Sequence, residues 1–167
     1  ADKFCRMYQK YFGLKAVIVK WLSVFGPGQK HYGVRKAVPT FIVAALQNKP
    51  LEIYGNGRQL ADFVYVTDTV NATIDLAESV KAYGGTFEIG TGKGISPIKL
   101  AKTVIKLSGS KSKIKYVPMR IGEDPNTKVI ANLKETRRII KYSPKIGLEE
   151  GLKSTIEYYR NLLAKDA

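Results

Sequence analysis

Glycine residues form the stretch of this chain best suited, by type and spacing, to binding a phosphate group. In Gly90-Thr91-Gly92-Lys93-Gly94 the glycines separate a strand-like segment from a helix-like one, and free amides at a helix start attract anions. The spacing matches neither G-x-G-x-x-G nor G-x-x-x-x-G-K-[ST], and no acidic residue ends a second strand at the distance that a ribose needs. We therefore expect a tight turn here.

Cys5 and His31 are the only cysteine and the only histidine. A single cysteine excludes an internal disulfide and a cysteine-based zinc site. Cys5 lies in an apolar helical stretch, which favours a buried structural thiol over a nucleophile. His31 has no helper residue at an obvious spacing, so serine–histidine or metal-dependent hydrolysis is not expected. We assign neither a metal site nor a catalytic residue to these 167 residues.

Length and hydropathy indicate one globular domain. The chain has 167 residues, of which 44% are hydrophobic, and this is enough to bury a core. No apolar run approaches the ~20 residues that a bilayer span needs. The first residues lack the basic and apolar segments of a secretory signal. We therefore predict no membrane span and a cytoplasmic location.

The charge balance favours anionic partners. Lys and Arg number 28 against 14 Asp and Glu, a net charge of +14. Nucleic acid, phosphorylated metabolites and acidic proteins all fit such an excess. Many basic residues between Lys93 and Lys145 lie opposite the apolar stripe of a helix, which is typical of a solvated face. This position argues against nucleic acid as the partner.

Hydrophobic periodicity predicts alternating strands and helices, and hence an α/β fold. Gly13 should end the first helix, Thr67 or Asp68 should cap the third, and Ser96 or Pro97 should begin the fourth. The predicted helices cover residues 2–12, 38–46, 67–80, 97–107, 133–141 and 148–163, and the predicted strands cover 16–19, 51–54, 63–66, 86–89 and 114–117.

Five stretches of sequence follow one another in a specific order. They are VIVKWLSVFGPGQ (17–29), KPLEIYGNGRQLADFVYVTD (49–68), FEIGTG (87–92), RIGE (120–123) and PKIGLEEGL (144–152). Together they resemble the motifs of extended short-chain dehydrogenases that act on nucleotide sugars, the NAD-dependent epimerase/dehydratase family that includes UDP-glucose 4-epimerase. The resemblance implies the C-terminal part of a Rossmann-type fold with its small α/β substrate-binding domain. Residues 1–167 would form one portion, in which about 1–24 and 62–97 join a larger Rossmann sheet.

The resemblance also implies residues that bind the substrate diphosphate and ribose. Ser23 stands where the family has an asparagine and can still donate one hydrogen bond. Ala61 stands where the family has an arginine, and Arg58 is our candidate to reach the same phosphate. Arg120 is the better phosphate ligand, since a guanidinium binds phosphate oxygens bidentately. Glu123 matches the acid that bonds the ribose hydroxyls, with a surface ion pair as the alternative.

Further matches concern the base and the cofactor. Tyr54 and Gly55 match the segment beside the base, although a plain strand end explains them equally well. Trp21 matches a position beside the nicotinamide ring of NAD, and a buried core aromatic is the alternative. The family's glycine fingerprint and its catalytic Tyr-x-x-x-Lys pair are expected upstream of Ala1 and absent from these residues.

Two functional hypotheses follow. In the first, the chain is the nucleotide-sugar-binding portion of an NAD-dependent epimerase or dehydratase acting on a UDP- or dTDP-hexose, inactive by itself. The whole enzyme would then form a homodimer, with residues 2–12 as part of the interface, although the apolar stripe of these residues fits core packing equally well. In the second, the chain is a non-catalytic basic module that binds nucleotide-sugar, nucleic acid or a protein partner.

Overall fold

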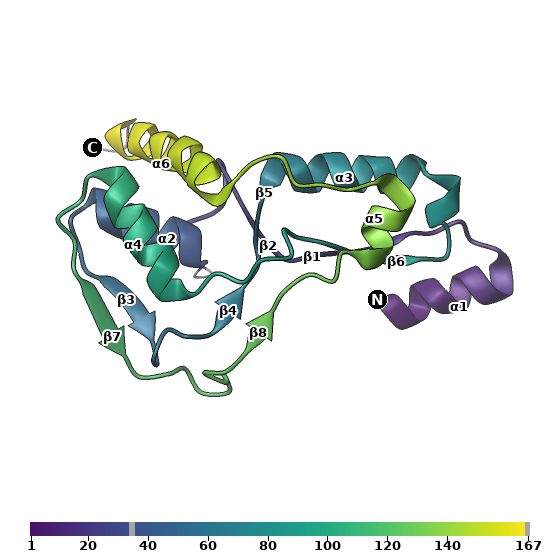
Figure 1. The fold of residues 1–167 in the computed structure, drawn as a ribbon, viewed down its shortest axis with the longest axis horizontal. Coiled ribbons are helices and arrows are strands. Elements are labelled where there is room, and N and C mark those ends of the chain that lie inside the picture. The colour runs from purple at the N-terminus through teal and green to yellow at the C-terminus, as the bar shows by residue number, and fades with distance from the viewer. Residues whose placement is uncertain (34–35, 166–167) are drawn as a thin grey trace.

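A computed structural model describes residues 1–33 and 36–165, and Figure 1 shows two lobes joined by short strands. The helices are α1 (Asp2–Phe12), α2 (Ala37–Leu46), α3 (Val66–Glu78), the 3-10 turn η1 (Val80–Ala82), α4 (Pro97–Ser108), α5 (Lys134–Ile140) and α6 (Leu148–Lys165). The strands are β1 (Ile18–Trp21), β2 (Ser23–Phe25), β3 (Leu51–Tyr54), β4 (Leu60–Ala61), β5 (Phe63–Tyr65), β6 (Thr86–Ile89), β7 (Ile114–Val117) and β8 (Lys128–Val129).

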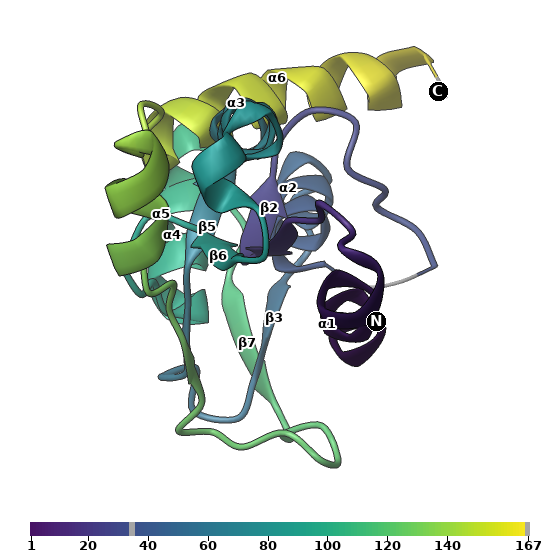
Figure 2. The same cartoon turned by 90° about the vertical axis from the view of Figure 1, so that its right-hand side faces the viewer.

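The two lobes divide these elements. The α2 lobe contains α2, α4, α6, β3 and β7, and the α3 lobe contains α1, α3, α5, β1 and β6. The remaining strands, β2, β4, β5 and β8, lie between the lobes, and we call this region the seam. Figure 2 shows α6 and α3 on one side of the molecule and β3 beside β7 on the other. The α/β class expected from the sequence is confirmed.

All the strand pairs are parallel. In the α3 lobe β1 pairs with β6, in the α2 lobe β3 pairs with β7, and in the seam β2 pairs with β5 and β4 with β8. An antiparallel bridge from Ala61 to Ile95 adds the segment after β6 to the seam. Parallel strands need long crossover connections, and here α2, α3 and α4 lie within them.

Each lobe has its own hydrophobic core. In the α2 lobe, apolar faces of α2, α4 and α6 pack on β3 and on the seam strands, with Ile42, Leu100, Leu152 and Tyr159 fully buried. In the α3 lobe, α3 and α5 pack on β6 around Leu76, Phe87 and Ile89. Burial of such side chains at about 25 cal/mol per Å² is the main stabilising contribution in each lobe.

The helix ends show which capping predictions were right. Gly13 ends α1 with φ 64° and Ser96 caps α4 by accepting a hydrogen bond from the Lys99 amide, as expected. The cap predicted at Thr67 or Asp68 is wrong. Tyr65 occupies the N-cap position of α3 without a side-chain bond, and Asp68 lies inside the first turn. Its carboxylate instead accepts hydrogen bonds from the backbone amides of the segment before α6.

Helix α1 lies on the surface of the α3 lobe and has no buried residue. The prediction of a buried Cys5 is therefore wrong, because this thiol is only half-buried. The polar side of α1 contacts the lobe through Arg6, which donates to Thr86, and through Gln9, which donates to the Ala16 carbonyl. In the part of the chain that the structure describes, no helix has the length and apolar character of a membrane span.

Candidate functional site

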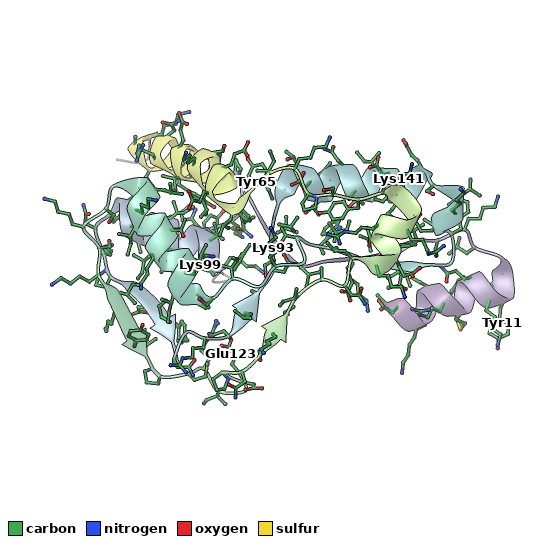
Figure 3. All side chains as sticks on the ribbon, in the orientation of Figure 1. Tyr11, Tyr65, Lys93, Lys99, Glu123 and Lys141 are labelled. Carbon is green, nitrogen blue, oxygen red and sulfur yellow. The ribbon has the colours of Figure 1, made fainter. Side chains whose placement is uncertain are left out.

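A hollow of about 790 Å³ opens beside the seam, between the ends of β1 and β2 and the loop that joins β7 to β8. Trp21 and Ser23 border it from one side, Ala61 from β4, and Arg120 and Glu123 from the loop. Figure 3 places Glu123 on this loop, below β4 and β8. The seam therefore brings together residues that are about 100 positions apart in the sequence.

A second hollow, of about 100 Å³, adjoins the first between α2 and the end of β3. Its lining includes Phe41, Ile53 and Tyr54, so it is narrow and largely apolar. The two hollows share one group of lining residues, which we call the neck. The neck consists of Lys36, Ala37, Gln59, Pro97 and Arg120. Ala37 and Pro97 are the first residues of α2 and α4, so two helix starts and two cations meet there.

Arg120 lies at the centre of this arrangement. Its Nη2 is 2.9 Å from Glu123 Oε1, and its guanidinium carbon is 4.5 Å from the centroid of the Tyr54 ring. The ring below and the carboxylate beside it fix the guanidinium plane. Three of the residues predicted from the sequence thus form one contact group, and the ion pair considered for Glu123 is formed with Arg120.

Ser23 and Trp21 border the larger hollow on its other side. The Ser23 amide donates to the Asp62 carbonyl, which fixes the start of β2. The Trp21 side chain is 60% exposed, and its indole N–H donates to Thr73 Oγ1 of α3 at 3.1 Å. A core position therefore does not explain Trp21.

Gly55 and Arg58 border neither hollow. Gly55 has φ 63°, a left-handed conformation that favours glycine, and a Cβ there would lie 2.6 Å from Cε at the flexible end of Met119. Arg58 is exposed, and its amide donates to Asn56 Oδ1. Ala61 does line the larger hollow, so the cation expected from the family pattern is missing from that wall.

Sequence reasoning missed several residues of the site. Lys36 brings a second cation to the neck from the residue before α2. Gln29 and Gln59 both border the larger hollow, and in each the side-chain oxygen is buried without a hydrogen-bond partner in the described structure. Such orphaned acceptors are costly unless a donor reaches them, as a ligand hydroxyl would. Only the position of both glutamines within the recognised motifs could have suggested them.

The turn expected at Gly90–Gly94 is an internal anion site. The amides of Thr91 and Gly92 donate to the Asp62 carboxylate at 2.8 Å each, and Thr91 Oγ1 donates to it at 2.5 Å. Asp62 is fully buried, and its carboxylate already accepts from these two amides of the loop. This loop is therefore a structural turn, as the sequence predicted.

The described residues do not form a complete site for NAD. The chain has no G-x-G-x-x-G turn, and Trp21 is the one residue assigned to the cofactor edge. The letters Tyr-x-x-x-Lys do occur, at Tyr11–Lys15 and Tyr32–Lys36, so their expected absence was wrong as a statement about sequence. Gly13 ends the helix between Tyr11 and Lys15, and the second match spans residues outside the described ranges.

Comparisons with known proteins agree with this geometry. Residues 1–90 match the model of the NAD dependent epimerase/dehydratase family. A UDP-N-acetyl-alpha-D-glucosaminuronate decarboxylase of Bacillus cytotoxicus is 36% identical over 90% of this chain and 48% of its own length. The crystal structure of UDP-glucose 4-epimerase from Thermotoga maritima with UDP-glucose matches with a TM-score of 0.91 and 31% identity, over 97% of this chain and 51% of that one.

A further solved structure contains both a nucleotide sugar and the cofactor. UDP-glucuronic acid 4-epimerase from Bacillus cereus, in complex with UDP-glucuronic acid and NAD, matches with a TM-score of 0.87 and 28% identity, over 96% of this chain and 50% of that one. The chain thus spans about half the length of the relatives it matches. Motifs, fold and comparisons lead to the same assignment: the chain belongs to the NAD-dependent epimerase/dehydratase family.

Proposed function

We propose that this chain is the nucleotide-sugar-binding portion of an NAD-dependent enzyme that acts on a UDP- or dTDP-linked hexose. The observation that carries the proposal is the neck, where Arg120 is stacked on Tyr54 and lies beside a second cation, Lys36. A diphosphate at the neck would place a base in the smaller hollow and a sugar in the larger one. The volume of about 100 Å³ favours a single-ring, pyrimidine base.

Each polar group has a role in this proposal. Arg120 binds phosphate oxygens through its guanidinium, with Lys36 as a second point charge. Glu123, released from Arg120, accepts a hydrogen bond from a ribose hydroxyl. Ser23 donates to the diphosphate, and Gln29 and Gln59 accept from sugar hydroxyls with the oxygens that are now unpaired. Gly55 sets the turn beside the base, and Arg58 reaches the phosphate by a change of rotamer.

We propose epimerisation as the reaction, with dehydration and decarboxylation as the alternatives found among the relatives. When bound, NAD would exchange a hydride with the sugar. This chain would contribute binding and orientation of the sugar, and Trp21 would border the nicotinamide. We further propose that residues 1–24 and 62–97 join a Rossmann sheet, that the whole enzyme is a homodimer, and that these residues alone do not catalyse.

Isothermal titration of the protein with UDP-glucose, dTDP-glucose and GDP-mannose tests the proposal. We expect saturable binding of the two pyrimidine nucleotides and much weaker binding of the purine nucleotide, because a two-ring base does not fit the smaller hollow. Equal dissociation constants for all three nucleotide sugars, or no binding of any, would refute the nucleotide-sugar assignment.

The net charge of +14 favours a second candidate, a basic module that binds a polyanion. Its affinity would fall steeply with salt, since counterions are released from the partner. Nucleotide-sugar binding in a hollow involves few phosphates and so depends less on salt. Titration of a DNA duplex and of UDP-glucose at two salt concentrations therefore separates the two functions.

A further inference from the structure

Asp62 is a buried carboxylate with an unusual set of partners. It is fully buried, and no ion pair in the described structure involves it. Its Oδ1 accepts from Thr91 through both the amide and the hydroxyl, and its Oδ2 accepts from the amides of Gly92 and Ala131 at 2.8 and 3.2 Å. Three backbone amides and one hydroxyl therefore hold this charge, and they come from two distant segments.

Those segments are two of the stretches of backbone that run between the lobes. Residues 90–95 lead from β6 to α4, and residues 129–133 lead from β8 to α5. The backbone of Asp62 adds to these bonds: its carbonyl accepts from the Ser23 amide, and its amide donates to the Val129 carbonyl. Asp62 is thus hydrogen-bonded to three backbone segments: the start of β2, the loop after β6, and β8 with the residues that follow it. These segments lie close to where the lobes meet in Figure 1.

Two of these segments, at β2 and at β8, also hold residues that line the larger hollow. Trp21 and Ser23 precede and begin β2, while Arg120 and Glu123 lie on a loop whose far end is β8. This loop is held at one end by the pairing of β7 with β3 and at the other by β8, next to Asp62. The distance between the two walls of the hollow therefore depends on the hydrogen bonds that hold the seam strands together.

We propose that Asp62 is a positioning residue that holds the two lobes in one orientation and thereby sets the affinity of the hollow for its ligand. The affinity readout rests on the proposed function, but the hold on the seam does not. The hydrogen bonds described for its carboxylate go to Thr91, Gly92 and Ala131, and none of these is assigned to phosphate, base or sugar. It acts through the backbone segments that carry them.

The test compares Asp62→Asn with Asp68→Asn. Asparagine keeps the shape, but its amide would face at least one of the backbone N–H donors that the carboxylate now accepts. Asp68 is the matched control, since it is also buried and also accepts two backbone amides, from Lys145 and Ile146, but lies away from the hollow. We expect both variants to lower Tm, and only Asp62→Asn to raise the Kd for UDP, by roughly tenfold.

Hydrogen exchange gives a readout that needs no ligand. In Asp62→Asn we expect faster exchange at residues 90–95 and 129–132, and in Asp68→Asn only at residues 143–148. Thr91→Val removes the hydroxyl that donates to Asp62 and accepts from the Lys93 amide. If Asp62→Asn does not fold, Thr91→Val should reproduce the exchange effect more weakly, with the part at residues 129–132 as the readout that the Lys93 bond does not affect. Unchanged exchange at the seam, or an equal rise in Kd in both variants, would overturn the inference. If the wild type binds no UDP, the proposed function fails and the exchange result alone decides on Asp62.

Discussion

Two neighbouring side chains hold Arg120 in place. The Tyr54 ring lies under its guanidinium and the Glu123 carboxylate beside it, so a bound phosphate would take the place of that carboxylate while the ring stays in contact. The sequence predicted all three residues from their motifs, although it could not show that they touch. Their contact depends on the pairing of β3 with β7, which is a long-range feature.

Arg120→Gln should therefore weaken nucleotide binding without unfolding the protein. Loss of a charge-assisted hydrogen bond costs about 1.5–3 kcal/mol, so we expect the Kd for UDP to rise about 10- to 100-fold. Arg138→Gln is the control, because Arg138 forms a similar exposed pair with Glu135 at 2.7 Å, on α5. Titration calorimetry measures both, and an equal loss of affinity in the control would contradict the role of Arg120.

The buried tyrosines predict a loss of stability at alkaline pH. Burial, with added repulsion from Asp68 and Asp62, raises the pKa of Tyr142 to about 12, and burial raises the pKa of Tyr159 to about 12 as well. In the unfolded chain a tyrosine titrates near pH 10. Both states are protonated below pH 10, and above it the unfolded state releases its protons first, so the free energy of unfolding falls between pH 10 and 12.

Each of these tyrosines should cost about 1.4 kcal/mol of stability at pH 11 relative to pH 8. Tyr142→Phe also loses the hydrogen bond to the Gly90 carbonyl, so it is less stable at pH 8 but should show about half of the alkaline loss. Urea unfolding at the two pH values measures this, with Tyr116→Phe at an exposed site as the control. An alkaline loss in Tyr142→Phe as large as in the wild type would be evidence against the raised pKa.

At the scale of elements, sequence reasoning identified every helix longer than one turn and the strands at 51–54, 86–89 and 114–117 with their observed bounds. It placed β1 two residues too early and missed β2, β4 and β8. These strands are two or three residues long, and β8 contains Lys128, so no hydrophobic alternation marks them. They exist because the lobes bring their partners together, and such pairing is not visible locally.

Gly151 of α6 shows how packing overrides local preference. A Cβ there would lie 2.6 Å from Tyr65 Cδ2 and 2.9 Å from Phe25 Cζ. Helix propensity alone predicts that Gly151→Ala stabilises the protein by about 1 kcal/mol. We expect a net loss of about 1–3 kcal/mol instead, because α6 must move off the seam strands. Thermal unfolding measures this against Gly147→Ala, where a Cβ meets no atom within 4 Å. A gain in Tm for Gly151→Ala would mean that the contact relaxes freely.

For the molecule as a whole, the sequence predicted the fold class and part of the lining of the candidate site, but not the two lobes or the neck that the two hollows share. Lys36 and Gln59 are examples. No local pattern marks Lys36, and Gln59 is marked only by its place in a recognised motif. Both line the same hollow as Arg120 because α2 begins, and the β3–β4 segment passes, beside the β7–β8 loop. The role of Asp62 was equally hidden, since its carboxylate bonds segments 29 and 69 positions away.

The exposed face of α1 carries the last prediction. Phe4, Tyr11 and Phe12 are 68%, 69% and 72% exposed, and Figure 3 shows Tyr11 pointing away from the rest of the molecule. Large apolar patches on a surface are typical of interfaces. If the proposed homodimer uses this face, the Phe4→Ser/Phe12→Ser variant should weaken self-association measured by sedimentation velocity across a concentration series. Its Tm should hardly change when both proteins are monomeric, because α1 buries no residue in the chain itself.

The control for α1 is Val80→Ser, which removes an equally exposed apolar side chain from η1. Its self-association should match that of the wild type. If the wild type sediments as a monomer throughout the series, or if both variants weaken association equally, α1 is not the dimer surface.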